Sequence, residues 1–320
     1  MTNLPHDTLD DAILRLIGML DSLIDGEGAM EQLIEVGPRA VPFLEHFLLE
    51  SPPRSLSPPR CRAVRALGSL GAYSSLIKYL QRYTCPSDAA VLFAEDAVRS
   101  AAGRELMGYE SSATFRVLCD ATKQRATGGL IQALSQYRWP ESVPILFELL
   151  EDDLCREDAT EGLRLVPDAA RAYALLLLHG STPQAIEGPT ASRRRRTTLQ
   201  LLVEFGIRMS EWSDLRMFLE DDDRDCVLSA ATLGMSFAPA AERPAIVKAV
   251  IEASKGMNWA QETIATELLD RWAPVARAVA REIYGQHDGR GEKPNWLSPF
   301  WRLLHHLLGD EFKGKRHDAA

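Results

Sequence analysis

The chain has 320 residues, 46% of them hydrophobic, and a formal net charge of −9 from 45 acidic and 36 basic side chains. This composition is ordinary for a folded protein and excludes extended disorder. An acidic chain repels phosphate backbones unless its basic residues gather on one face, so nucleic acid is not the expected default partner.

The start of the chain indicates neither a secretory signal nor a membrane anchor. Residues 1–11 are polar and acidic, and the longest apolar run, residues 172–178, is far too short to span a bilayer. We therefore expect a cytoplasmic location and no membrane insertion. Residues 7–25 carry leucine and isoleucine at helical spacing, which predicts an amphipathic helix that caps the fold, within an N-terminal segment of residues 1–26.

A pattern of one small-residue helical stretch, a short turn and one bulky apolar stretch then returns roughly every 30 to 37 residues, as in stacked helical repeats. The returning positions, each of which opens a segment, are Met30, Val64, Val98, Gly129, Thr160, Thr197, Val227 and Thr263. Their partners begin near Ala40, Ser74, Ala113, Ser142, Asp168, Trp212, Glu242 and Pro274. This register predicts an all-α fold, in which about eight helical hairpins form one array over residues 27–286.

Local signals support the hairpins. Gly37 can adopt the left-handed conformation that ends a helix, and the prolines of residues 51–60 exclude a helix there. Small residues such as Ala101 and Ala102 in the first helices permit close backbone approach, while bulky residues of the second helices fill the layers. The acidic runs at residues 151–153 and 220–223 each precede a first helix, so we expect them to cap it.

The five cysteines indicate neither disulfides nor a metal site. Cys61, Cys85, Cys119, Cys155 and Cys226 are odd in number and far apart, with no CxxC pair and no histidine at a metal-ligand spacing. Free cysteine is often buried, so we interpret them as small apolar side chains in a reducing compartment. The sequence predicts no cofactor and no metal.

The sharpest local feature is a run of four arginines, Arg193, Arg194, Arg195 and Arg196, which ends the longest internal loop of the array. Consecutive helical positions lie about 100° apart, so Arg193 and Arg196 share a face while the other two point elsewhere. Two interpretations stay open. The run is either a solvated helix start or a site for an anionic partner.

Trp212 and Trp259 lie near turns between helices. Packing in the core explains most tryptophans, but an exposed one would be an interface anchor. After residue 286 a polar linker leads to a helix that starts at Ser298 and Pro299, followed by a tail expected to be disordered. That helix of the C-terminal segment, residues 287–320, either covers the last layer or docks elsewhere, for instance on a membrane surface.

Several segments resemble HEAT repeats, including the short bacterial variants of this family. The resemblance is carried by residues 33–44, 63–71, 95–102 and 142–146, and Asp96 and Arg99 match the family's acidic and basic positions. It implies an armadillo-like α-solenoid, a right-handed α-α superhelix whose second helices line a concave face. It also implies that the usual work of the protein is to hold another protein.

No nucleophile, phosphate loop or HExxH motif has a recognisable context, so we assign no catalytic residue. The sequence therefore predicts a non-enzymatic scaffold or adaptor that binds a protein partner on its concave face, with Arg193 to Arg196, Trp212 and Trp259 as candidate contacts. The alternative is a HEAT-like nucleic-acid-binding protein or DNA glycosylase with a basic groove. The oligomeric state stays open.

Overall fold

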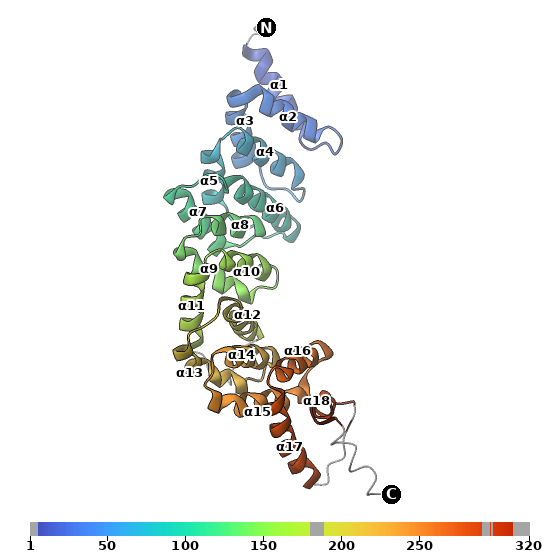
Figure 1. The fold of residues 1–320 in the computed structure, drawn as a ribbon. Helices are drawn as coiled ribbons and strands as arrows, with labels where there is room; N and C mark the ends of the chain where they lie inside the picture. Colours follow the sequence, from blue (N-terminus) through green and yellow to red (C-terminus); the bar gives the residue numbers. More distant parts are fainter. Residues whose placement is uncertain (1–5, 180–188, 290–294, 296, 310–320) are drawn as a thin grey trace. The chain divides into compact units, whose positions relative to one another are not determined.

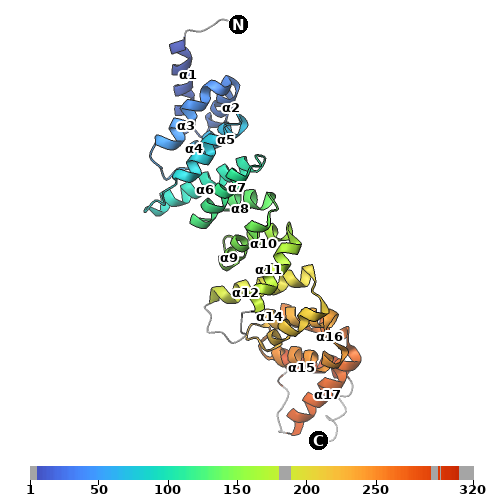
Figure 2. The same ribbon diagram turned by 90° about the vertical axis from the view of Figure 1, so that its left-hand side faces the viewer.

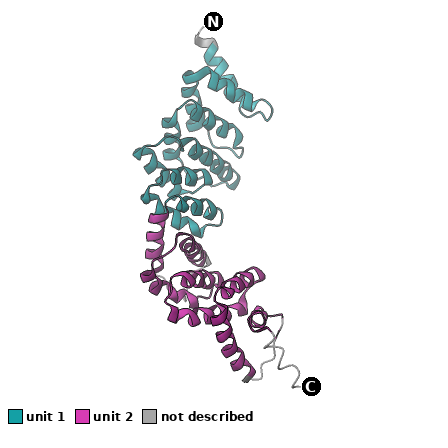
Figure 3. Cartoon of the chain, in the orientation of Figure 1, with its two compact units in different colours: residues 1–166 teal, residues 167–320 magenta. Residues whose placement is uncertain are grey.

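The computed structural model describes residues 6–179, 189–289, 295 and 297–309, and all regular elements in these ranges are helical. The chain is therefore all-α, as predicted. It divides into two compact units, Met1–Val166 (unit 1) and Pro167–Ala320 (unit 2), which Figure 3 distinguishes by colour. None of the described helices is long and apolar enough to cross a membrane.

Unit 1 is a series of paired helices (Figure 1). Its helices are α1 (His6–Met19), α2 (Gly26–Val36), α3 (Val41–Glu50), α4 (Pro58–Ser69), α5 (Tyr73–Arg82), α6 (Ala89–Leu106), α7 (Ser112–Gln124), α8 (Gly128–Gln136), α9 (Val143–Glu148) and α10 (Arg156–Arg164). The 3-10 turns are η1 (Gly37–Ala40), η2 (Pro140–Ser142) and η3 (Leu149–Glu151). The first helices α2, α4, α6, α8 and α10 stack in sequence, and so do the second helices α3, α5, α7 and α9.

Small residues bring the first helices together, as the sequence predicts. A Cβ atom on Gly103 of α6 would lie 2.5 Å from the carbonyl oxygen of Gly129 in α8, and one on Gly129 would overlap the Ser100 carbonyl oxygen. The Gly129 amide also donates a hydrogen bond of 2.9 Å to the Ser100 hydroxyl. Because glycine alone has no Cβ, these two positions set the close contact of α6 and α8.

Unit 2 is also built of paired helices (Figure 2). One of its second elements is a four-residue helix between two 3-10 turns. Its helices are α11 (Pro167–His179), α12 (Pro189–Phe205), α13 (Trp212–Leu215), α14 (Arg224–Phe237), α15 (Arg243–Ala253), α16 (Trp259–Asp270), α17 (Ala273–Gly289) and α18 (Pro299–Leu308). The 3-10 turns are η4 (Met209–Glu211), η5 (Arg216–Glu220), η6 (Ala240–Glu242) and η7 (Ser254–Gly256). Here α12, α14 and α16 are the stacked first helices.

The C-terminal helix α18 packs against α15, α16 and α17. Its Phe300, Trp301, Leu303, Leu304, Leu307 and Leu308 are buried. The sequence left open whether this helix covers the end of the fold or docks elsewhere. The structure supports the first interpretation, because the apolar face of α18 is buried against α15, α16 and α17. The tail from residue 310 and loop residues 180–188 lie outside the described residues.

Candidate functional site

The arginine run lies in α12, where two of its members already have carboxylate partners. Arg195 is buried and its Nε atom lies 2.8 Å from Asp221 Oδ2, in an ion pair whose acidic partner is also buried. Arg196 lies 2.7 Å from Asp223 Oδ2 and 3.2 Å from Asp225 Oδ2. These pairs join α12 to the start of α14, so Arg195 and Arg196 stabilise unit 2 and are not open anion ligands.

The carboxylates of this contact have two roles. Asp223 caps α14 by accepting a hydrogen bond from the Asp225 amide at 2.9 Å, as the acidic run predicts. Burial of Asp223 opposes its ionisation, but the hydrogen bond and charge of Arg196 prevail and lower the pKa of this carboxyl group. The assignment of the arginine run to a binding partner stays a prediction, and these ion pairs favour the structural interpretation.

The two candidate tryptophans differ in their surroundings. Trp212 is 1% exposed, its Nε1 atom donates a hydrogen bond of 2.8 Å to Glu242, and its ring packs against Gly234. It is a core side chain, and its burial favours packing in the core over a surface contact. Trp259 is 80% exposed at the first position of α16, after the N-cap residue Asn258. Only Trp259 therefore has the exposure that an interface anchor needs.

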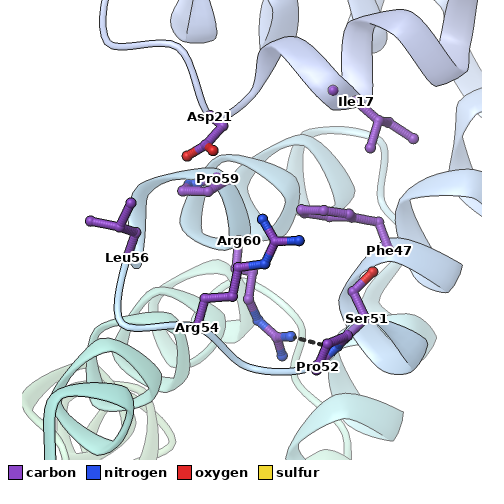
Figure 4. A pocket seen from close by; sticks show the side chains of 10 residues that line it. Ile17, Asp21, Phe47, Ser51, Pro52, Arg54, Leu56, Pro59 and Arg60 are labelled. Atoms are coloured by element: carbon purple, nitrogen blue, oxygen red, sulfur yellow. Dashed lines mark hydrogen bonds between the residues drawn. The ribbon is translucent and has the colours of Figure 1, made fainter.

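A pocket of about 210 Å³ opens in unit 1 between α1, α3 and the loop that leads into α4 (Figure 4). It is lined by Ile17, Gly18, Asp21, Phe47, Ser51, Pro52, Arg54, Leu56, Pro59 and Arg60. The walls are mainly apolar because the proline-rich loop cannot continue as a helix and instead folds over α1 and α3. Prolines that the sequence places in an exposed loop thus form part of a concave surface.

Three charged groups lie at this pocket. Arg60 Nη1 donates a hydrogen bond of 2.9 Å to the Ser51 carbonyl oxygen, the bond drawn in Figure 4. Asp21 and Arg54 are both exposed, and neither makes a hydrogen bond or ion pair with the described residues. The pocket therefore combines an apolar interior with one free carboxylate and one free guanidinium at its surface.

A buried polar network fixes the wall of the pocket that Arg60 forms. Arg60 Nε lies 3.1 Å from Glu95 Oε1 in α6, and the Tyr79 hydroxyl donates a hydrogen bond of 2.8 Å to Glu95 Oε2. Burial is the main cause that raises the pKa of Tyr79, so this hydroxyl stays a donor. One helical turn from Glu95, Arg99 stacks 3.8 Å over the Tyr83 ring and donates to the Ala121 carbonyl oxygen.

Sequence reasoning missed Arg60 and Glu95. A signal was present, because each is a charged residue on the apolar face of a first helix, and they are separated by 35 residues, about one repeat. The apolar periodicity of one helix indicates that a charged residue lies on its buried side. It does not identify the oppositely charged partner, because that depends on how far the next helix is shifted along the stack.

Large apolar side chains are exposed where the chain enters the first helices of unit 1. Leu23, Ile24, Leu56, Phe93 and Leu154 are between 60% and 91% exposed. Four of them lie in the loops before α2, α4 and α10, and Phe93 lies in the second turn of α6. We call these loops, residues 20–25, 51–57, 83–88, 125–127 and 151–155, together with Phe93, the inter-repeat edge of unit 1.

No group of three or more histidine, cysteine, aspartate or glutamate side chains in the described ranges is arranged to hold a metal ion. The cysteines are free, and burial is the main cause that raises the pKa of Cys119 and Cys155 to about 11. Those thiols are protonated near neutral pH, which removes the thiolate that nucleophilic catalysis requires.

Comparison of the chain with known proteins gave no relative from which a function could be transferred. No family model matches it, and neither the curated proteins nor the solved structures that were searched contain a match.

Proposed function

We propose that this protein is a non-enzymatic HEAT-like scaffold that binds a partner protein, and that the pocket of unit 1 receives an apolar side chain of that partner. The observation that carries the proposal is the pocket's size and lining. A cavity of about 210 Å³ lies below the roughly 300–1,000 Å³ of small-molecule sites. Apolar anchors of protein partners occupy such well-walled pockets, where they contribute most of the binding energy.

The position of the pocket also supports this proposal. Leu56, a wall residue, is itself exposed, and the free Asp21 and Arg54 stand beside it. An apolar centre with a polar surround is the arrangement of protein interfaces. Trp259 in unit 2 is a second candidate contact, separate from this pocket.

The nucleic-acid alternative has less support than the scaffold. Its main sequence feature was the arginine run, and Arg195 and Arg196 are engaged by Asp221, Asp223 and Asp225. Phosphate binding depends on cations that can replace counterions. In a chain of net charge −9, arginines with carboxylate partners do not provide them.

The test is affinity capture from the native cells, with and without nuclease, using wild type and two glycine variants as bait. Gly18 lines the pocket, and a Cβ atom placed on it meets nothing within 4 Å, so Gly18→Phe fills the cavity without a clash at Cβ. Gly285→Phe in α17 of unit 2 has the same freedom at Cβ and is the matched control.

We expect wild type and Gly285→Phe to capture the same protein with and without nuclease. Gly18→Phe is expected not to capture that protein. If nuclease removes all retained material, the scaffold is wrong and nucleic acid is the partner. If Gly18→Phe retains the same protein as wild type, the pocket is not the contact.

A further inference from the structure

The exposed apolar side chains of the inter-repeat edge lie near the starts of the first helices of unit 1. Glu27 contacts Arg62 and Arg60 contacts Glu95, and each pair is separated by 35 residues. Leu23 lies in the loop directly before α2 and Phe93 lies in the second turn of α6, and α4 is stacked between these two helices.

Leu56 and Leu154 extend this row. Leu56 lies in the loop directly before α4, and Leu154 lies directly before α10. Because α2, α4, α6, α8 and α10 stack in order, the segments that enter them lie along one side of unit 1, as Figure 1 shows for the loops before α2, α4, α6 and α10. The loop before α8 carries no large apolar residue, so the row has a gap there.

The edge that carries this row is acidic. Asp21, Asp25, Asp88 and Asp152 are exposed and have no cationic partner among the described residues. Three of them accept local hydrogen bonds, Asp25 from Ser22, Asp88 from Val91, and Asp152 from Leu154 and Cys155. Of the two arginines in these loops, Arg125 pairs with Asp96, which leaves Arg54 as the base without a carboxylate partner.

We propose that the inter-repeat edge of unit 1 binds an extended, basic segment of a partner protein with an apolar residue at about every third position. The inference rests on the proposed scaffold function and specifies the chemistry of its partner. Stacked helices lie about 8–10 Å apart, and an extended chain in the polyproline II conformation advances about 3.1 Å per residue with three residues per turn, so every third side chain lies on the same side and reaches the next first helix. Lysine or arginine between the apolar residues then faces the free aspartates.

The inference is tested with the full chain and synthetic peptides, by fluorescence anisotropy at low and high salt. The probe peptide has leucine at every third position and lysine between. One control peptide replaces each lysine by glutamate, and another has the same composition with adjacent leucines. We expect binding of the probe that weakens with salt, and at least about tenfold weaker binding of both controls.

Protein variants locate the site. The exposed side chains at Leu23, Phe93 and Leu154 are replaced singly and together by serine, and Leu176→Ser in α11, an equally exposed leucine of unit 2, is the control. We expect the triple variant to bind the probe about tenfold or more weakly, with unchanged thermal unfolding, and Leu176→Ser to bind as wild type does. Arg54→Ala is expected to strengthen binding, because it removes the unpaired positive charge.

Equal binding of the glutamate peptide or of the adjacent-leucine peptide would overturn the inference. So would wild-type affinity of the triple variant. Light scattering that shows a dimer in wild type and a monomer in the triple variant would assign the edge to a second copy of the chain instead. The two proposals can fail separately. If the probe peptide does not bind, but wild type still captures a protein in the presence of nuclease and Gly18→Phe does not, this inference is rejected and the scaffold proposal stands.

Discussion

The Arg60 guanidinium and the Glu95 carboxylate form an ion pair of 3.1 Å between α4 and α6, with side chains only 7% and 3% exposed. Arg60 also holds the loop carbonyl of Ser51, so this single contact connects two stacked repeats to the wall of the pocket. A buried charge is tolerated only while its partner is present. The stability of unit 1 and the shape of its candidate site therefore depend on the same pair.

The first prediction concerns removal of that partner. Glu95→Gln keeps the size of the side chain and leaves Arg60 buried without a counter-charge, which is expected to destabilise unit 1 by about 3–5 kcal/mol. Asp10→Asn breaks the partly exposed pair with Arg39 and is expected to cost less than about 1 kcal/mol. Urea unfolding, with hydrogen exchange in α4 and α6, measures both. Equal effects would mean that the buried pair is not structurally important.

The second prediction concerns the contact of α6 and α8. Gly103→Ala places a methyl group against the Gly129 carbonyl, a backbone atom that cannot move without the helix, so a loss of about 1–3 kcal/mol or more is expected. Gly28→Ala in α2 meets nothing within 4 Å and is expected to raise the stability of unit 1 by about 0.5–1 kcal/mol. Thermal unfolding of the two variants should shift in opposite directions, and a common direction would contradict the close approach.

The third prediction separates the two candidate tryptophans. Trp212→Ala removes a core side chain and its hydrogen bond to Glu242, and is expected to cost about 3–5 kcal/mol. Trp259→Ala removes an exposed side chain and is expected to change the free energy of unfolding by less than about 0.5 kcal/mol. Denaturant unfolding of both variants checks this contrast. A large loss in Trp259→Ala would show that this side chain is structural and not an available contact.

The fourth prediction is a dependence of unit 2 on pH. The pKa of Asp223 is lower in the folded chain than the usual value of about 3.9, so its ion pair with Arg196 stabilises the fold above that value. As the pH falls through the folded pKa, the carboxylate is protonated in both states and the contribution is lost. We expect hydrogen exchange in α12 and α14 to accelerate below about pH 4.

Asp223→Asn should remove part of this acid sensitivity, because it has no carboxylate to titrate. Asp222→Asn, at the exposed neighbouring position, is the control and should retain the wild-type profile. An unchanged profile in Asp223→Asn would assign the acid sensitivity of unit 2 to other groups.

The helical hairpins follow from local sequence signals. Gly37 adopts a positive φ of 78° at the end of α2, and Asp223 and Asn258 accept the amide hydrogen bonds that start α14 and α16. Such signals act within a few residues and can be read without knowledge of the fold. The recurrence of small and bulky helices also determines that the chain stacks as an all-α array, since neither helix of a pair can bury its apolar side alone.

The burial and the partners of the candidate site residues could not be predicted from the sequence, because they depend on contacts between residues far apart in the chain. Two neighbouring arginines of one run, Arg195 and Arg196, differ in burial, and Trp212 is buried while Trp259 is exposed, although both tryptophans lie near turns. Periodicity gives the face of a helix on which a residue lies. It does not give the rotation and offset at which the next helix packs, and these decide whether a charge meets a carboxylate, such as Asp221 or Glu95, or water.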